Sequence, residues 1–91
     1  MEFEWDEEKS ARNAADRGLP FEVAVKLFDN ATLEWDDRRW NYMERRICAI
    51  GRIGDRCFVC VYTWRDGRRR IISLRKASPG ESHAYRKTFL G

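Results

Sequence analysis

Three apolar segments follow one another in the second half of the chain, with a two-residue turn between each pair. The segments are 46–53, 56–64 and 69–75, and the turns are Gly54-Asp55 and Asp66-Gly67. Turn residues of this kind between apolar runs favour tight hairpins, in which neighbouring strands are antiparallel. The middle segment, RCFVCVYTW, is apolar at both parities, which predicts a central strand covered on both faces. The sequence therefore predicts an antiparallel sheet at the centre of the fold.

Two helices are expected before this sheet segment. Asp6 is an N-cap residue and Gly18 is a stop signal, so the first helix spans about 7–17. Its expected inner face consists of small side chains: Ala11, Ala14 and Ala15. Pro20 opens the second helix, at a position where proline is tolerated. The apolar stripe of that helix repeats at i, i+3, i+4 and i+7: Phe21, Ala24, Val25 and Phe28.

The remaining elements complete an α+β architecture. Residues 3–5 and 32–37 are expected to be short strands, and 37–45 reads as a loop or wide hairpin. The segment Ser78–Glu81 is a capping box with proline at the first helical position, and it predicts a last helix that ends near Phe89. The predicted fold has two layers, with two N-terminal helices and a C-terminal helix packed on an antiparallel sheet.

Length and composition limit the class of protein. A chain of 91 residues argues for one domain, residues 1–91, with one modest core. Hydrophobic residues make up 43% and charged residues 36%, and no run approaches the ~20 apolar residues of a membrane-spanning helix. The acidic opening MEFEWDEEK lacks the basic and then apolar regions of a signal peptide. A cytoplasmic protein is therefore expected.

The charges are divided unevenly along the chain. Residues 1–37 hold 11 acidic and 4 basic residues, whereas residues 38–91 hold 14 basic and 4 acidic residues. Of the 18 cations, 14 are arginine, the side chain that binds phosphate through two parallel hydrogen bonds. The pattern predicts a dipolar molecule whose basic half meets nucleic acid, while the acidic half repels it or meets a basic partner.

Three cysteines lie inside apolar runs: Cys48, Cys57 and Cys60. An odd number in such positions indicates reduced core cysteines rather than a disulfide framework. Cys57 and Cys60 match C-x-x-C, but residues three apart on a strand point to opposite faces. Glu34 and Asp36 share a parity without a third ligand nearby. No metal site and no cofactor are therefore expected.

Several motifs appear in the order and spacing of one known family. They are FEWDEEK…N (Phe3–Asn13), G-L-P-F-E-x-A (Gly18–Ala24), F-D (Phe28-Asp29), I-G (Ile50-Gly51) and RIISLRKAS…E…Y (Arg70–Tyr85). With them the chain resembles the BrnT toxins of bacterial type II toxin–antitoxin pairs along essentially its whole length. The resemblance implies a RelE-like fold, an endoribonuclease that halts translation, and a BrnA antitoxin with a ribbon-helix-helix DNA-binding domain. Many relatives carry Lys-His before the glycine that ends the first helix; this chain has Asp16 and Arg17 there.

RNA cleavage without metal needs cations and a proton-transfer group. The 2′-hydroxyl attacks the adjacent phosphorus, a base takes its proton, an acid protonates the leaving 5′-oxygen, and cations stabilise the phosphate charge. Strand parity places Arg69, Ser73 and Arg75 on one face of the last strand. The other parity is expected to face mostly the core: Arg70, Ile72, Leu74 and Lys76. The candidate catalytic residues are Lys9, Arg70, Arg75, His83 and Tyr85.

Each catalytic candidate also has a purely structural interpretation. Arg75 suits a salt bridge that locks strand to helix, and Arg70 suits solvation at the sheet edge. Lys9 suits an ion pair with the aspartate three residues before it. His83, the only histidine, suits an exposed position on the last helix. Tyr85 suits the core, or a cleft where its hydroxyl meets the phosphate site.

A second set of residues is expected to bind RNA: Arg39, Trp40, Arg45, Arg69 and Lys76. Aromatic side chains interleaved with arginines in 38–46 are typical of a base-stacking surface, and equally of an antitoxin-binding rim. The function expected is a metal-independent endoribonuclease toxin neutralised by a BrnA-like antitoxin, in a hetero-oligomer such as a 2:2 complex that meets operator DNA only through the antitoxin. The alternative is a non-catalytic RNA- or protein-binding module of the same fold.

Overall fold

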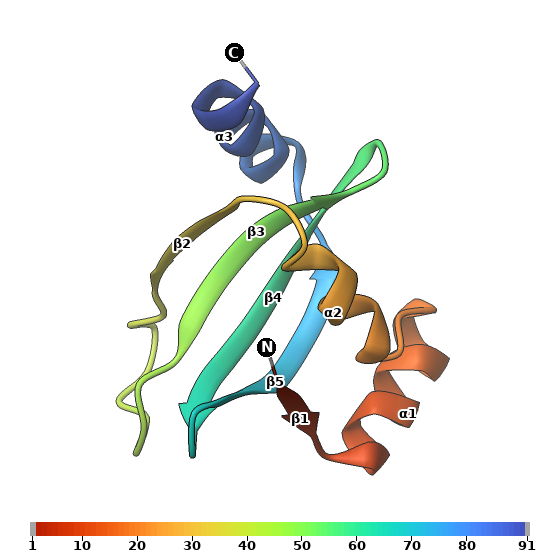
Figure 1. Ribbon diagram of the computed structural model, residues 1–91, viewed down its shortest axis with the longest axis vertical. Helices are drawn as coiled ribbons and strands as arrows, with labels where there is room; N and C mark the ends of the chain where they lie inside the picture. Colours follow the sequence, from red (N-terminus) through yellow and green to blue (C-terminus); the bar gives the residue numbers. More distant parts are fainter. Residues whose placement is uncertain (1, 91) are drawn as a thin grey trace.

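The computed structural model describes residues 2–90, and the order of its elements is the expected one (Figure 1). The elements are β1 (Phe3–Trp5), α1 (Glu7–Arg17), α2 (Glu22–Leu27), β2 (Thr32–Asp36), β3 (Ile47–Ile53), β4 (Arg56–Arg65), β5 (Arg68–Lys76) and α3 (Pro79–Phe89). The α+β class is confirmed. The observed bounds depart from the expected ones by one or two residues, which is the ordinary uncertainty of element ends.

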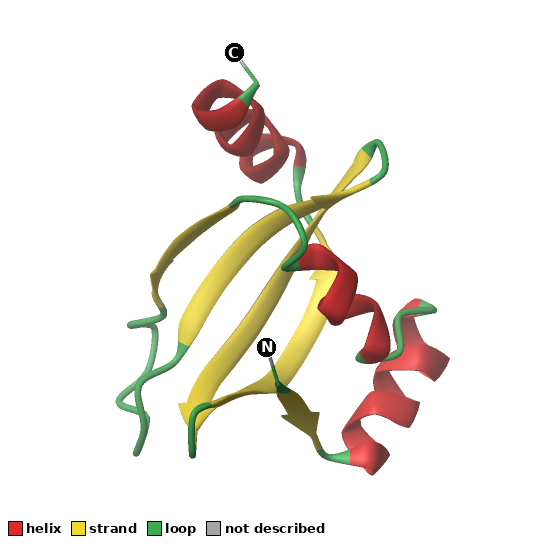
Figure 2. Cartoon of the chain, in the orientation of Figure 1, coloured by secondary structure: helices red, strands yellow, loops and turns green. Residues whose placement is uncertain are grey.

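The five strands form one mixed sheet in the order β1-β5-β4-β3-β2 (Figure 2). Both hairpins are confirmed, because β3–β4 and β4–β5 are antiparallel. The second turn needs positive φ at both central residues, and Asp66 (52°) and Gly67 (77°) supply it. The expectation of an all-antiparallel sheet is wrong at one edge, where β1 pairs parallel to β5. This pairing covers part of an edge that the last hairpin would otherwise leave open.

The central strand β4 separates two apolar clusters, and residues 57–63 are all buried. Its larger cluster packs against α2 and the segment 19–21, and we call this side of the sheet the α2 face. Alternate residues point the other way, to a smaller cluster under α3 that contains Ile50, Val59 and Tyr85. Helices therefore lie on both sides of the sheet, instead of in the single layer that a two-layer fold implies. We call the second side the pocket face.

The ends of α1 form as expected, but its inner face does not. The Asp6 carboxylate accepts hydrogen bonds from the backbone N–H groups of Glu8 and Lys9, and Gly18 ends the helix at φ 71°. The prediction of an alanine inner face is wrong, because Ala11 and Ala15 are exposed.

Polar side chains hold α1 in place instead. Asn13 donates to the carbonyls of Leu19 and Leu74 at 2.6 and 2.9 Å, and the Ser10 hydroxyl accepts from the Phe21 N–H at 2.9 Å. The helix thus docks against backbone that turns back after Gly18, where buried polar groups need partners.

The second helix is shorter than its apolar stripe. Phe21 and Ala24 are buried as predicted, whereas Val25 and Phe28 are only half-buried and Leu27 is fully buried. Leu27 packs directly on Gly51 of β3, where an added Cβ would come within 2.5 Å of the Leu27 Cγ. The I-G pair in β3 therefore gives α2 its close approach to the sheet.

A β-bulge in β5 decides which arginines face the pocket side. Val61 pairs with Ser73 but Tyr62 pairs with Ile71, so Ile72 is an extra residue. The bulge directly follows Ile71, the last partner of β1. An extra residue reverses the alternation of side chains. Both predicted parity groups are therefore wrong: Arg69 points to the α2 face with Ile71 and Leu74, and Ser73 and Arg75 point to the pocket face.

The three cysteines are buried and unbonded. Cys57 belongs to the cluster under α3 and Cys60 to the cluster under α2, which confirms that the two point to opposite faces. Burial raises the pKa of Cys48 and Cys60, so both thiols stay protonated at neutral pH. None of the described helices has the length and hydrophobicity needed to cross a membrane.

Candidate functional site

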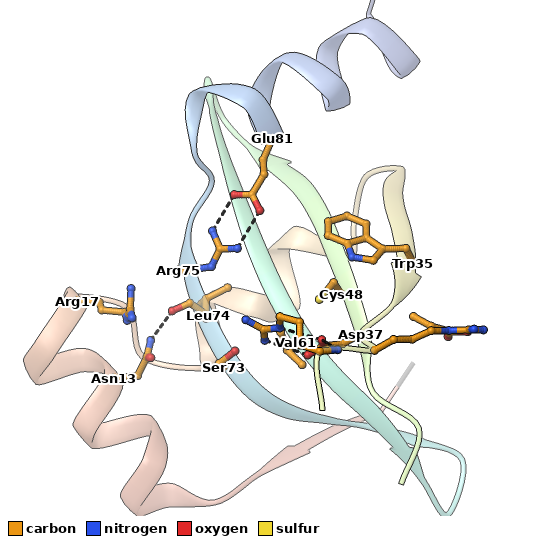
Figure 3. Close-up of a pocket in the computed structure, with 13 residues that line it drawn as sticks. Asn13, Arg17, Trp35, Asp37, Cys48, Val61, Ser73, Leu74, Arg75 and Glu81 are labelled. Carbon is orange, nitrogen blue, oxygen red and sulfur yellow. Dashed lines mark hydrogen bonds and ion pairs between the residues drawn. The ribbon is translucent and has the colours of Figure 1, made fainter. Parts of the chain in front are cut away.

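A cavity of about 440 Å³ opens on the pocket face next to the start of α3 (Figure 3). Its floor is formed by side chains of three neighbouring strands: Cys48 of β3, Val61 of β4, and Ser73 of β5. The last turns of α1, the end of β2 with the residues after it, and the start of α3 form the walls. The full lining is Asn13, Arg17, Trp35, Asp36, Asp37, Arg38, Arg39, Cys48, Val61, Ser73, Leu74, Arg75 and Glu81. We call this cavity the arginine pocket.

Arg75 and Glu81 form a two-pronged ion pair in the arginine pocket (Figure 3). Both Nη atoms of Arg75 lie 2.8 Å from a carboxylate oxygen of Glu81. Glu81 also accepts from the Ser78 N–H at 2.8 Å, which confirms the capping box. The hydrogen bonds from Arg75 lower the pKa of Glu81 to about 2, and the same pairing raises the pKa of Arg75. Both groups are therefore charged at neutral pH. Their salt bridge connects strand β5 to helix α3, as the structural interpretation of Arg75 expected.

A second ion pair lies on the other wall. The side chain of Asp37 is buried and accepts from Arg39 Nε at 2.9 Å, from Arg39 Nη2 at 3.0 Å and from the Tyr42 hydroxyl at 3.2 Å. The Arg39 hydrogen bond lowers the pKa of Asp37 to about 2, and the pairing raises the pKa of Arg39. The Arg39 guanidinium itself is exposed, with 71% of its side-chain surface open to solvent. It is anchored at one side and accessible at the other.

Charges of both signs converge in this cavity, with a small excess of cations. The cations are Arg17, Arg38, Arg39 and Arg75, and the anions are Asp36, Asp37 and Glu81. The guanidinium fork matches a phosphate as well as it matches a carboxylate. An incoming phosphodiester can therefore replace Glu81 on Arg75 without a change in the geometry of the arginine. The site is therefore suited to binding an anion that takes the place of the Glu81 carboxylate on Arg75.

Only one of the five candidate catalytic residues, Arg75, lies in the arginine pocket. Lys9 is exposed on α1, beside a separate shallow depression that also contains Arg12 and Asp16. Arg70 forms an ion pair with Glu4 of the neighbouring strand β1 at 2.7 Å. The described structure therefore gives Arg70 a partner at the edge between β1 and β5.

The two candidates on α3 also lie elsewhere. His83 is exposed beside Arg86, Lys87 and Leu90. Tyr85 is buried under α3, and its hydroxyl donates to the Ala31 carbonyl at 2.8 Å. That hydroxyl ties α3 to the segment before β2 and does not line the arginine pocket.

The five expected RNA-binding residues are scattered as well. Arg39 lines the arginine pocket, and Arg45 lies next to it in an ion pair with Asp36 at 2.8 Å. Trp40 is 74% exposed in the loop between β2 and β3. Lys76 is exposed at the end of β5. Arg69 lies on the α2 face, where its guanidinium carbon is within 4.2–5.1 Å of the ring centres of Phe28, Trp64 and Tyr62.

Sequence reasoning did not select several of the residues that line the arginine pocket. Asn13 and Arg17 come from α1, Trp35 and Asp37 from the end of β2, and Ser73 from β5. The alternation in β2 was a usable signal, since Trp35 and Asp37 share a parity. The approach of α1 to β5 had no local signal, because it depends on contacts between residues about sixty positions apart.

The paired arginines in this cavity have the planar guanidinium groups that bind phosphate through two hydrogen bonds. The comparison with family models is more specific: the model for "Ribonuclease toxin, BrnT, of type II toxin-antitoxin system" matches residues 5–81. The chain belongs to this family, and a type II system pairs the ribonuclease toxin with an antitoxin protein. No curated protein matches the chain. The matched range includes the whole arginine pocket and stops before His83 and Tyr85.

Proposed function

We propose that this chain is a metal-independent endoribonuclease with a RelE-like fold that cleaves RNA in the arginine pocket and thereby inhibits translation in the cytoplasm. The observation that carries the proposal is the Arg75–Glu81 pair, which presents a guanidinium and a carboxylate together at the wall of an open cavity. Arg39 provides a second anchored guanidinium in the same cavity. The carboxylates of Glu81 and Asp37 are each paired with an arginine, so neither needs a metal ion to hold it in place.

The proposed reaction begins with exchange of anions on Arg75. A phosphodiester takes the two N–H groups that Glu81 occupies in the free protein. Without Arg75, the pKa of Glu81 rises from about 2 toward its usual value of 4.5, which makes it a better base. Glu81 then accepts the 2′-hydroxyl proton while the 2′-oxygen attacks phosphorus. The products are a 2′,3′-cyclic phosphate and a 5′-oxygen that takes its proton from water in the open pocket.

The arginines stabilise the charge that builds up on the phosphate oxygens in this reaction. Preorganised donors aimed at developing charge account for large parts of enzymatic rate enhancement. Arg75 is fixed by the strand and by the start of α3, and Arg39 is fixed by buried Asp37. Lys9, Arg70, His83 and Tyr85 have no part in this proposal, because none of them lines the cavity.

The proposed partner is a BrnA-like antitoxin with a ribbon-helix-helix domain, in a 2:2 complex that reaches operator DNA only through the antitoxin. Residues 38–91 carry 14 basic and 4 acidic residues, so an acidic antitoxin segment gains most by covering this half. The loop after β2 adds exposed apolar side chains, Trp40 and Met43, which follow Arg38 and Arg39 of the arginine pocket along the chain. An antitoxin segment that covered the pocket and this loop would exclude RNA and bury both apolar side chains.

The test is RNA cleavage by the purified chain, with EDTA and with magnesium. Cleavage is expected to be equal in both, with 2′,3′-cyclic phosphate and 5′-hydroxyl ends. Activity that disappears on chelation and returns with magnesium would contradict the metal-free mechanism. Growth arrest on expression of the chain alone, relieved by co-expression of the neighbouring antitoxin gene, tests the biological role.

One observation favours the alternative of a non-catalytic binding module. Glu81 and Asp37 both have a pKa near 2, and Arg17 lies in the cavity at a position where many relatives carry histidine. In the free protein, neither of these two carboxylates is therefore a base matched to neutral pH. RNA binding without cleavage would support the alternative. Arg17→His would then be expected to add cleavage that titrates near the ordinary histidine pKa of about 6.5.

A further inference from the structure

Within residues 2–90, Trp35 is the one aromatic side chain that lines the arginine pocket. It lies on β2 opposite Cys48 of β3, so its ring points to the pocket face. Figure 3 shows the ring at the side of the cavity, between the start of α3 and the Asp37 wall. Its exposed fraction is 42%, although the ring is large and apolar.

The exposure of Trp35 follows from its place on an edge strand. Leu33, two residues earlier on the same side, packs under α3 with Ile50 and Tyr85. Glu81 is the one described residue of α3 that lines the pocket, so the helix does not cover Trp35, the next side chain on this side of β2. No strand lies beyond β2 in the described sheet to cover the ring from the side. The indole is therefore partly open at the wall of the cavity.

Trp35 shares the cavity with arginines whose guanidinium groups suit phosphate. Asp37, which anchors Arg39, is two residues farther along the same side of the chain, a spacing of about 6.6 Å in a strand. Arg75 faces the same cavity from β5. An aromatic ring beside anchored arginines is the combination that single-stranded nucleic acids meet on their binding proteins: bases stack on rings and phosphates pair with cations.

We propose that Trp35 is the stacking platform for an unpaired RNA base adjacent to the phosphate that Arg75 and Arg39 hold. The inference rests on the proposed function, since it names how that site selects its substrate. A base inside an RNA duplex has no free ring face, so the platform selects single strands. Stacking depends on the ring face and not on base edges, so the preference is for the presence of a base rather than for one sequence.

Two other tryptophans provide controls. Trp64 has a similar exposed fraction, 47%, but it lies on the α2 face, edge-to-face with Tyr62 at 5.7 Å. Trp40 is more exposed than either and lies in the loop between β2 and β3, outside the lining of the cavity. Trp35→Phe keeps a stacking ring, Trp35→Ala removes it, and Trp64→Ala removes a ring of similar exposure from the opposite face.

The experiment measures equilibrium binding of two uncleavable probes at one fixed low salt concentration. One probe is a short single-stranded RNA with 2′-O-methyl groups throughout, and the other has the same backbone without bases. Wild type is expected to bind the base-containing probe about tenfold more tightly, the order of magnitude of one stacked base. Trp35→Ala should bind both probes equally, at the wild-type affinity for the abasic one. Trp35→Phe should keep most of the preference, and Trp64→Ala should match wild type.

The outcomes separate this inference from the proposed function. A Trp35→Ala variant that keeps the preference for bases, or that loses affinity equally for both probes, overturns the stacking role. So does a variant that binds RNA normally but binds the antitoxin more weakly, because Trp35 would then belong to that interface. Failure of wild type to cleave ordinary RNA counts against the proposed reaction alone, since neither probe needs to be cleaved.

Discussion

Two arginines on the same strand, Arg69 and Arg75, show how differently the two faces of this sheet use one residue type. Arg69 lies on the α2 face among the rings of Phe28, Tyr62 and Trp64. Arg75 lies on the pocket face, paired with a carboxylate at the wall of an open cavity. The first guanidinium helps to hold aromatic side chains together. The second is held by Glu81, the partner that we propose an incoming phosphate replaces.

The comparison indicates that the role of an arginine on β5 depends on which face of the sheet its side chain occupies. The bulge at Ile72 puts the two arginines on opposite faces, although their even spacing would put them on the same face of a regular strand. Changes on the α2 face should therefore alter stability, and changes on the pocket face should alter RNA cleavage.

The largest expected effect is on the α2 face. Phe21 is 1% exposed between α2 and the sheet, so Phe21→Ala should lower the free energy of unfolding by about 3–5 kcal/mol. Denaturant titration followed by circular dichroism measures the loss. Val25→Ala, at a half-buried position of the same helix, is the control and should cost clearly less. Equal losses at the two positions would mean that the core under α2 is not where the structure puts it.

Removal of Arg75 tests the pocket face. Arg75→Ala should lower the rate of RNA cleavage about 10²- to 10³-fold, the size expected for loss of one donor to developing charge. Its effect on stability should be about 1 kcal/mol or less, because the ion pair with Glu81 is partly exposed. Cleavage rates and unfolding curves are measured on the same preparation. A folded variant that cleaves at the wild-type rate would remove Arg75 from the mechanism.

Arg69→Ala provides the opposite pattern with a smaller effect. Loss of the contacts with the three aromatic rings should lower the free energy of unfolding by about 1–2 kcal/mol. Cleavage by the folded variant should equal that of wild type, because the guanidinium lies on the α2 face. A large fall in cleavage with normal stability would instead show that RNA contacts the α2 face.

The pH dependence of stability provides the smallest effect. The pKa of Glu81 is about 2 in the folded protein and about 4.5 when unfolded. Its contribution to stability is therefore complete above pH 4.5 and is lost as the pH falls from 4.5 toward 2. Glu81→Gln should cost about 1 kcal/mol at pH 7, allowing for solvent screening, and less at pH 3. A gap between wild type and variant that stays constant or grows toward pH 3 would contradict the ion pair.

The parts of this fold that could be predicted from sequence are those with local causes. The caps at Asp6, Gly18 and Ser78 and the Asp66-Gly67 turn depend on neighbouring residues, and each is present. The parallel pairing of β1 and the bulge at Ile72 depend on partners far along the chain. The candidate site was the least predictable part, because one added residue in β5 puts Arg69 and Arg75 on opposite faces of the sheet.

The central claim is that RNA phosphate replaces Glu81 on Arg75 at the pocket face. The most direct measurement follows the side-chain Nε–Hε NMR signals of the arginines while an uncleavable single-stranded RNA is added. The account predicts that the signals of Arg75 and Arg39 shift with one shared binding curve while the signal of Arg69 stays in place. Shifts at Arg69 with no change at Arg75 would contradict it.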